Sequence, residues 1–135
     1  MSTEPDAPFR NKYPIDLILG VLFTLLMGVI ALYSAMIGFQ GKGSAADMAT
    51  AWPNIMTGIA SLIGGVGYLR FKKWSIPVYA VAVIGHFVSH GELIYLRTVS
   101  RHITIANVTV LAIVPLIALV ILGNMARQLK THLVT

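Results

Sequence analysis

The amino-acid sequence predicts an all-α integral membrane protein, a four-helix bundle whose neighbouring spans run antiparallel. Three observations lead to this fold class: 56% of the 135 residues are hydrophobic, only 11% are charged, and the apolar residues fall into four long runs. A soluble domain of ordinary composition has about 25% charged residues, with which it covers its water-facing surface. Four crossings of about 20 residues each leave no room for a separate soluble domain.

The expected elements follow the chain in order. Residues 1–13 are hydrophilic and predict a mobile cytoplasmic tail. The bundle occupies residues 14–126, and its first apolar run is longer than the roughly 7–15 residues of a signal-peptide core, which favours a retained anchor. Residues 127–135 form a basic cytoplasmic tail. The four spans are expected at about residues 14–39, 51–71, 74–96 and 103–126.

Proline positions support these boundaries. Pro14, Pro53 and Pro77 each fall in the first turn of a span, where a missing N–H costs nothing. Pro115 lies in the middle of the fourth span, so it should free the Leu111 carbonyl and kink the helix. The connections between spans are short, which predicts antiparallel neighbours.

The basic residues predict the orientation of the spans. An even number of crossings places both termini on one side, and Lys and Arg gather on the cytoplasmic side of membrane proteins. Seven fall on the side of the termini and three on the other: Arg10, Lys12, Arg70, Lys72, Lys73, Arg127 and Lys130 against Lys42, Arg97 and Arg101. We therefore expect a bacterial-type inner-membrane protein with cytoplasmic termini. Because these charges do not gather on one face, no nucleic-acid partner is expected.

The third span contains the most polar stretch inside any apolar run, from Gly85 to Glu92. His86 and His90 are four residues apart and share a helix face. They could chelate one metal ion, but they cannot be the two axial ligands of one haem, which approach it from opposite sides. Glu92 lies about 160° around the helix from His90, so it does not complete a three-ligand set. A polar stretch at this depth marks a functional site or a paired structural contact.

Two interpretations of this stretch stay open. In the structural one, His86, His90 and Glu92 form hydrogen bonds to neighbouring helices, with Arg97 or Arg101 as counter-charge for Glu92. The candidate partners at similar depth are Tyr33, Ser34, Asn54, Thr57, Asn107 and Thr109. In the functional one, the histidines hold a metal, haem or quinone, or serve a proton or solute pathway.

Small residues four apart form the main packing pattern, because they allow close approach of helix backbones. The second span is rich in glycine. The residues expected at helix contacts are Gly58, Ala60, Ser61, Gly64, Gly65, Gly85 and Ser89. Their number exceeds what a four-helix bundle needs, which predicts a membrane-protein partner or a homo-oligomer in addition to the lipid bilayer.

Asp16 lies in the first turn of the first span, where a carboxylate stabilises a helix N-terminus. Small dimeric multidrug exporters carry their coupling carboxylate deep in the first helix, and Asp16 is too shallow for that role. The sequence thus favours a non-enzymatic accessory, assembly or protective subunit that works through helix contacts. The alternative is a cofactor- or proton-handling redox subunit that uses His86, His90 and Glu92.

Overall fold

The computed structural model describes residues 14–101 and 104–131. Regular structure in these two ranges is entirely helical, which confirms the all-α class. The helices are α1 (Ile15–Phe39), α2 (Ala45–Ala49), α3 (Ala51–Leu69), α4 (Ser75–Val99) and α5 (Ile105–Thr131). Helices α1, α4 and α5 are long and apolar enough to cross a membrane. The expected tail at residues 1–13 lies outside the described residues.

The count of helices differs from the expected four, and three rather than four of them are clearly membrane-spanning in length and composition. The difference lies in α3, which has 19 residues. Pro53, Asn54 and the glycines of α3 make this helix less hydrophobic than the most apolar stretches of α1 and α5. At about 1.5 Å per residue, α3 is roughly 28 Å long, close to the roughly 30 Å of the hydrocarbon core.

The additional helix, α2, forms inside the segment that the sequence predicted as a loop. Ser44 and Asp47 explain its start, because each caps the other. The backbone N–H of Ser44 donates to Asp47 Oδ2 at 2.6 Å, and the N–H of Asp47 donates to Ser44 Oγ at 3.3 Å. This reciprocal pattern is the capping box of helix N-termini. A short helix therefore turns the chain from α1 into α3.

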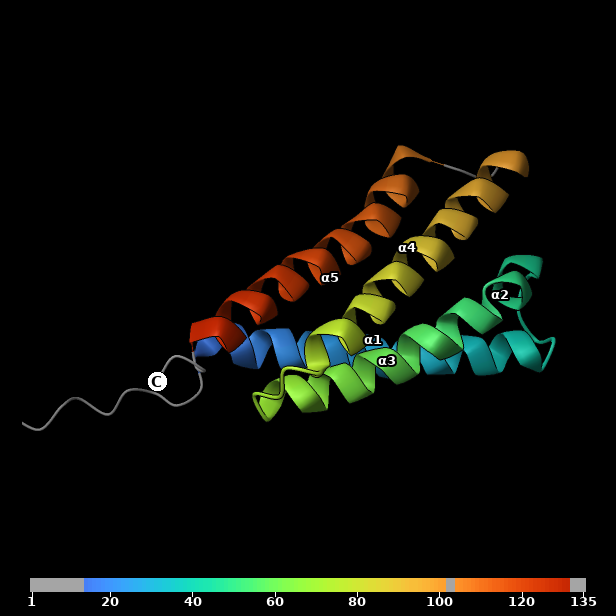
Figure 1. The fold of residues 1–135 in the computed structure, drawn as a ribbon. Helices are drawn as coiled ribbons and strands as arrows, with labels where there is room; N and C mark the ends of the chain where they lie inside the picture. The colour runs from blue at the N-terminus through green and yellow to red at the C-terminus, as the bar shows by residue number, and fades with distance from the viewer. Residues whose placement is uncertain (1–13, 102–103, 132–135) are drawn as a thin grey trace, which may run out of the picture.

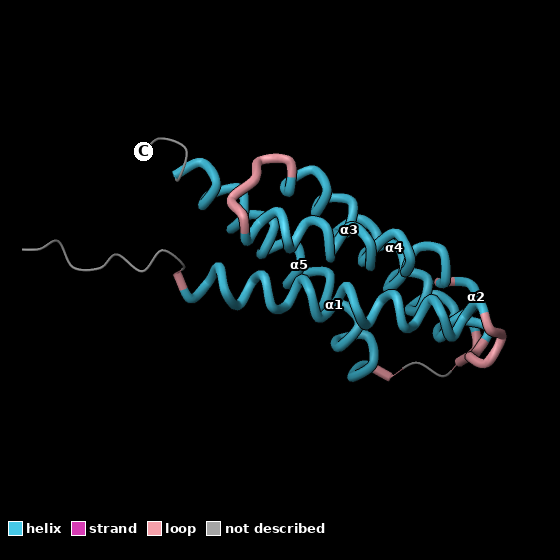
Figure 2. The backbone as a smooth tube through the Cα atoms, turned by 90° about the horizontal axis from the view of Figure 1, so that it is seen from below, coloured by secondary structure: helices cyan, strands magenta, loops and turns pink. Residues whose placement is uncertain are grey.

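The long helices form two antiparallel hairpins, α1 with α3 and α4 with α5, which cross obliquely in Figure 1 and overlap along their length in Figure 2. The most extensive contacts join α1 to α3 and α3 to α4. Helix α5 packs mainly on α4 and meets α1 at few places. The start of α1 and the end of α5 lie together at the left of Figure 1.

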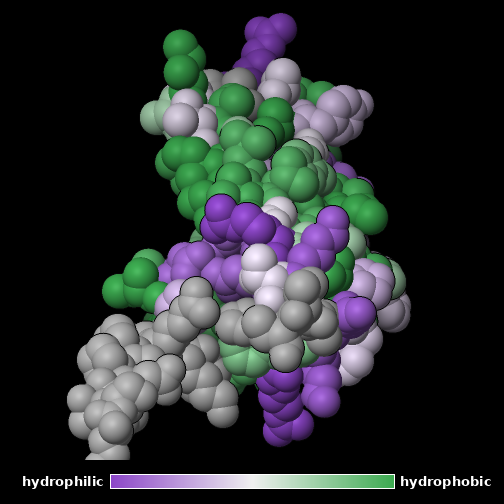
Figure 3. Space-filling model, turned by 60° about the vertical axis from the view of Figure 1, so that its left-hand side comes forward, coloured by the Kyte–Doolittle hydropathy of each residue, from purple (hydrophilic) through white to green (hydrophobic). Residues whose placement is uncertain are grey.

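The buried core lies toward this shared end, where all four long helices meet. Tyr68 of α3 and Tyr79 of α4 are its largest side chains, and both are fully buried. The remaining core residues are Leu17, Val21, Ala60, Ala82, Val83, Ala118, Met125 and Leu129. Figure 3 shows hydrophilic residues gathered around this end and a broad hydrophobic surface beyond them. That surface suits a lipid environment.

Two helices end differently from the expectation. Helix α3 stops before residue 71 because Phe71 has a φ of 53°, and the Lys72 N–H returns to the Gly67 carbonyl at 2.9 Å. This is a Schellman closure. Helix α5 continues past the expected end at residue 126, because Gln128 and Leu129 are buried against the other helices. Pro115 lies inside α5 and is also buried.

Candidate functional site

The polar stretch of α4 lies on both the inner and the outer side of the helix. His86 is buried, with 2% of its surface exposed, whereas His90 and Glu92 are half-buried. The two imidazole rings have centroids 5.7 Å apart. His90 Nδ1 lies 2.8 Å from the His86 carbonyl oxygen, so this nitrogen carries the proton and donates it within the helix. The remaining nitrogen of His90, Nε2, is then an acceptor or a metal ligand.

The expected hydrogen bonds from this stretch to other helices are not formed among the described residues. The candidate partners bond within their own segments: Asn54 Nδ2 donates to Thr50 Oγ1 at 3.4 Å, and Thr57 Oγ1 donates to the Pro53 carbonyl at 2.7 Å. Thr109 bonds to its own helix, the Asn107 backbone N–H bonds to Thr104, and Tyr33 is 60% exposed. The structural interpretation in its expected form is therefore wrong for these pairs.

Two buried atoms of this stretch have no hydrogen-bond partner within residues 14–101 and 104–131, namely His86 Nε2 and Glu92 Oε2. A buried polar atom without a partner costs about 1–3 kcal/mol. The expected ion pair of Glu92 with Arg97 or Arg101 is absent, since the ion pair found in the described part joins Asp16 and Arg127. The same ranges contain no group of three His, Cys, Asp or Glu side chains that could hold a metal.

The predicted packing residues lie at contacts between helices of this chain. Gly58 and Gly65 of α3 face α1, and Gly64 faces α4. A Cβ at Gly58 would lie 2.9 Å from the Gly28 carbonyl oxygen, one at Gly65 3.1 Å from Thr24, and one at Gly64 3.0 Å from Tyr79 Cβ. A Cβ at Gly85 would collide with Thr57. Ala60, Ser61 and Ser89 are buried as well.

The small residues of α3 pack against helices of the same chain, so their number no longer indicates a partner helix. The glycines of α3 are used by α1 and α4 of the same chain. On α1, the sequence analysis overlooked Gly28, which lies against Gly58. Its small neighbours on the same face of α1, Gly20, Thr24, Ala31 and Ala35, recur three or four residues apart and are buried. That spacing was the available signal.

A second polar cluster, which sequence reasoning missed, joins three helices at the end where α1 begins and α5 ends. Asp16 Oδ2 of α1 accepts hydrogen bonds from Gln128 Nε2 at 2.5 Å and from Asn124 Nδ2 at 3.2 Å. The Tyr68 hydroxyl of α3 donates to Gln128 Oε1 at 2.6 Å. Arg127 Nη2 donates to Asn124 Oδ1 at 2.6 Å and lies 3.9 Å from Asp16 Oδ2. We call these five residues the Asp16 network.

The Asp16 network fixes the ends of α1, α3 and α5 relative to one another. Asn124 and Gln128 are four residues apart, so they share one face of α5 and reach the same carboxylate. From the sequence, Gln128 was expected in a tail beyond the bundle, and Asp16 was expected to stabilise the N-terminus of the first span. The spacing of Asn124 and Gln128 at the depth of Asp16 was the signal that could have found the network.

Comparisons of this chain with protein-family models, curated proteins and solved structures found no match. The members of the Asp16 network hydrogen-bond to one another, whereas the α4 stretch leaves His86 Nε2 and Glu92 Oε2 without partners in the described residues.

Proposed function

We propose that this chain crosses a bacterial-type inner membrane four times, with both termini in the cytoplasm, and acts as a non-enzymatic accessory, assembly or protective subunit. It works through helix contacts with another membrane protein. The length of α3 and its antiparallel packing between α1 and α4 support a fourth crossing. The excess of exposed Lys and Arg at the end where α1 begins and α5 ends supports the orientation.

The uncovered surface of α5 is the observation that carries the proposed role. Only 11% of the most apolar stretch of α5 is buried inside the chain, against 33% of that of α1 and 28% of that of α4. From Ile105 to Val110 every residue except Asn107 is exposed. Ile105 is 89% exposed and Val110 is 64% exposed. Asn107 and Thr109 place polar groups in this half, and polar side chains in a membrane helix favour contact with another helix.

Site-specific photo-crosslinking in intact membranes tests this proposal. A photoreactive amino acid at Val110 should form a covalent adduct with a membrane protein. The matched control is Val29 of α1, which is 58% exposed and should react with lipid. Adducts with lipid alone at Val110, at normal protein levels, would contradict the proposed role.

A second function is favoured by the unpartnered atom His86 Nε2. In this alternative the chain is a redox or proton-handling subunit, and His86, His90 and Glu92 contact a metal, haem or quinone. Two imidazoles four residues apart on one helix can supply two metal ligands, and the others must come from water, a partner or a cofactor. A stoichiometric metal content or a visible absorption band in the purified protein would favour this function over the first.

A further inference from the structure

An open groove runs between α1 and α5 on the side of the molecule where these two helices separate. It has a volume of about 540 Å³, and apart from one carboxylate its walls are apolar. Its lining includes Asp16, Gly20, Leu22 and Leu26 of α1 and Ile117 and Ile121 of α5. The helices touch near Gly20, where an added Cβ would lie 3.6 Å from Ile121. Beyond this contact they diverge (Figure 1).

The length and composition of the groove match one acyl chain. From Asp16 to Leu26 the wall of α1 rises over ten residues, or about 15 Å. This is half of the roughly 30 Å hydrocarbon core, which is the depth of one leaflet. The groove begins at the end of the molecule that carries the exposed residues Arg127 and Lys130. A lipid of the same leaflet can therefore place its chain against Leu22, Leu26 and Ile117.

Two opposite charges stand at the mouth of the groove. Asp16 and Arg127 lie 3.9 Å apart, and their side chains are 41% and 73% exposed. Arg127 uses one N–H on Asn124, and a guanidinium has five donors. It therefore retains donors for a phosphate. The Asp16 carboxylate is partly open and attracts a cation.

This pair of charges favours a zwitterionic headgroup with an ammonium. A purely anionic headgroup would bring its charge next to the Asp16 carboxylate. A phosphocholine headgroup is also zwitterionic, but its quaternary ammonium has no N–H to donate to a carboxylate. Ethanolamine phosphate carries a negative phosphate and a positive –NH₃⁺ joined by a two-carbon linker, complementary to the neighbouring charges of Arg127 and Asp16. We propose that the α1–α5 groove binds one ethanolamine glycerophospholipid, with its phosphate on Arg127, its ammonium on Asp16 and an acyl chain along the groove.

Native mass spectrometry of the full chain, released from nanodiscs with equal parts of phosphatidylethanolamine, phosphatidylglycerol and phosphatidylcholine, tests the proposal. We expect one retained phosphatidylethanolamine per chain, preferred about fivefold over each of the other two, which corresponds to about 1 kcal/mol. Equal retention of the three lipids, preference for phosphatidylglycerol, or no retained lipid would each overturn the proposal.

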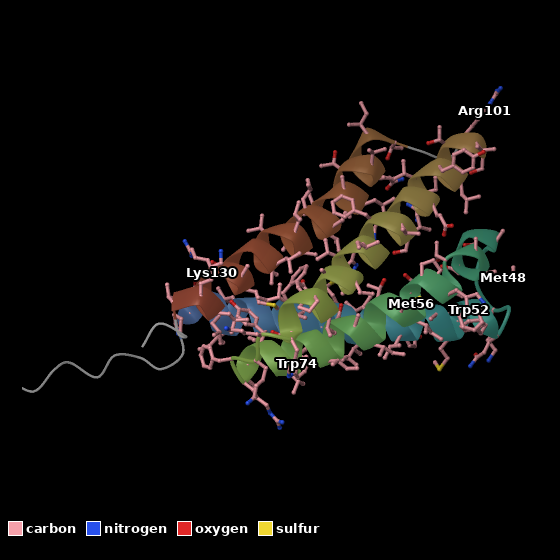
Figure 4. The ribbon with its side chains drawn as sticks, viewed as in Figure 1. Met48, Trp52, Met56, Trp74, Arg101 and Lys130 are labelled. Carbon is pink, nitrogen blue, oxygen red and sulfur yellow. The ribbon has the colours of Figure 1, made fainter. Side chains whose placement is uncertain are left out.

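Charge variants test the contacts to the lipid headgroup separately from the contacts to the acyl chain. Asp16→Asn keeps an acceptor for Asn124 and Gln128 but removes the charge, so the preference should move to phosphatidylglycerol. Arg127→Gln should lower retention of all three lipids. The matched control is Arg101→Gln, because Arg101 and Lys130 lie at opposite ends of the α4–α5 hairpin (Figure 4). An unchanged preference in Asp16→Asn would overturn the headgroup assignment.

A variant that fills the groove tests the site without changing the Asp16 network, whose loss could itself unfold the protein. Leu22 is 57% exposed and lines the groove, whereas Leu119 is 48% exposed and does not line it. Leu22→Trp should abolish lipid retention at unchanged thermal unfolding, and Leu119→Trp should retain the lipid. Retention in both variants would contradict a site in this groove.

Discussion

Gly28 of α1 and Gly58 of α3 face each other so closely that a Cβ on either one would press on the backbone of the other. A Cβ at Gly28 would lie 3.2 Å from the Gly58 carbonyl oxygen, and a Cβ at Gly58 would lie 2.9 Å from the Gly28 carbonyl oxygen. Leu62 and Leu32 close the contact on either side. In a membrane, where lipid tails are as apolar as leucine, such close packing is what holds helices together.

The first prediction concerns this contact. Gly58→Ala should destabilise the bundle by about 1–3 kcal/mol through overpacking, because the obstructing atoms include backbone that cannot move aside. Gly123→Ala on α5 is the control, since nothing lies within 4 Å of its added Cβ. Thermal unfolding in detergent measures both. The interpretation fails if Gly58→Ala unfolds at the same temperature as the unaltered protein.

The second prediction concerns the Asp16 network. Tyr68→Phe removes the donor to Gln128 and leaves a buried amide oxygen without a partner, so it should lower the free energy of unfolding by about 1–3 kcal/mol. Tyr33→Phe is the matched control, because Tyr33 is 60% exposed and makes no hydrogen bond among the described residues. Equal unfolding temperatures for the two variants would show that the Tyr68 bond does not stabilise the bundle.

The third prediction concerns His86. If its Nε2 has no partner in the membrane, His86→Leu should stabilise the bundle by about 1 kcal/mol or leave it unchanged, because an unsatisfied polar atom is removed. His86→Gln and His90→Gln should both be mild. Thermal unfolding and recovery of the crosslinked partner measure these effects. Loss of function in both Gln variants, with normal membrane levels and normal unfolding, would instead support the redox alternative, because Gln is a poor metal ligand and does not titrate near neutral pH.

The fourth prediction concerns the topology. Reporter fusions at Ser44 and Ser100 should be active in the periplasm, and fusions at Lys73 and Thr135 in the cytoplasm. These sites follow from four crossings and from the basic residues near the α3–α4 turn and the end of α5. A cytoplasmic signal at Ser44 together with a periplasmic one at Lys73 would reverse the orientation. Signals on the same side at Ser44 and Lys73 would remove α3 from the crossings.

The helical class and the approximate helix positions could be predicted from the sequence, because both depend on local properties. Apolar runs, prolines in first turns and basic residues at the ends of runs each act within a few residues of the chain. The short helix α2 was within reach of the same reasoning, since Ser44 and Asp47 form a capping box with the required spacing. It was overlooked because the segment also contains Gly41 and Gly43, which suggested a loop.

Which polar and small residues meet could be seen only once the helices were packed together. Asp16 and Gln128 are 112 positions apart, and neither has a local pattern that names the other, because their contact depends on where α1 and α5 cross. In the same way, the glycines of α3 suggested an external partner helix until α1 and α4 were seen to cover them. Hydropathy and spacing record what each helix can bury, whereas the packing of all the helices determines which neighbour buries it. For this reason the separation of α5 from α1, and the groove between them that begins at Asp16, could not be predicted from the sequence.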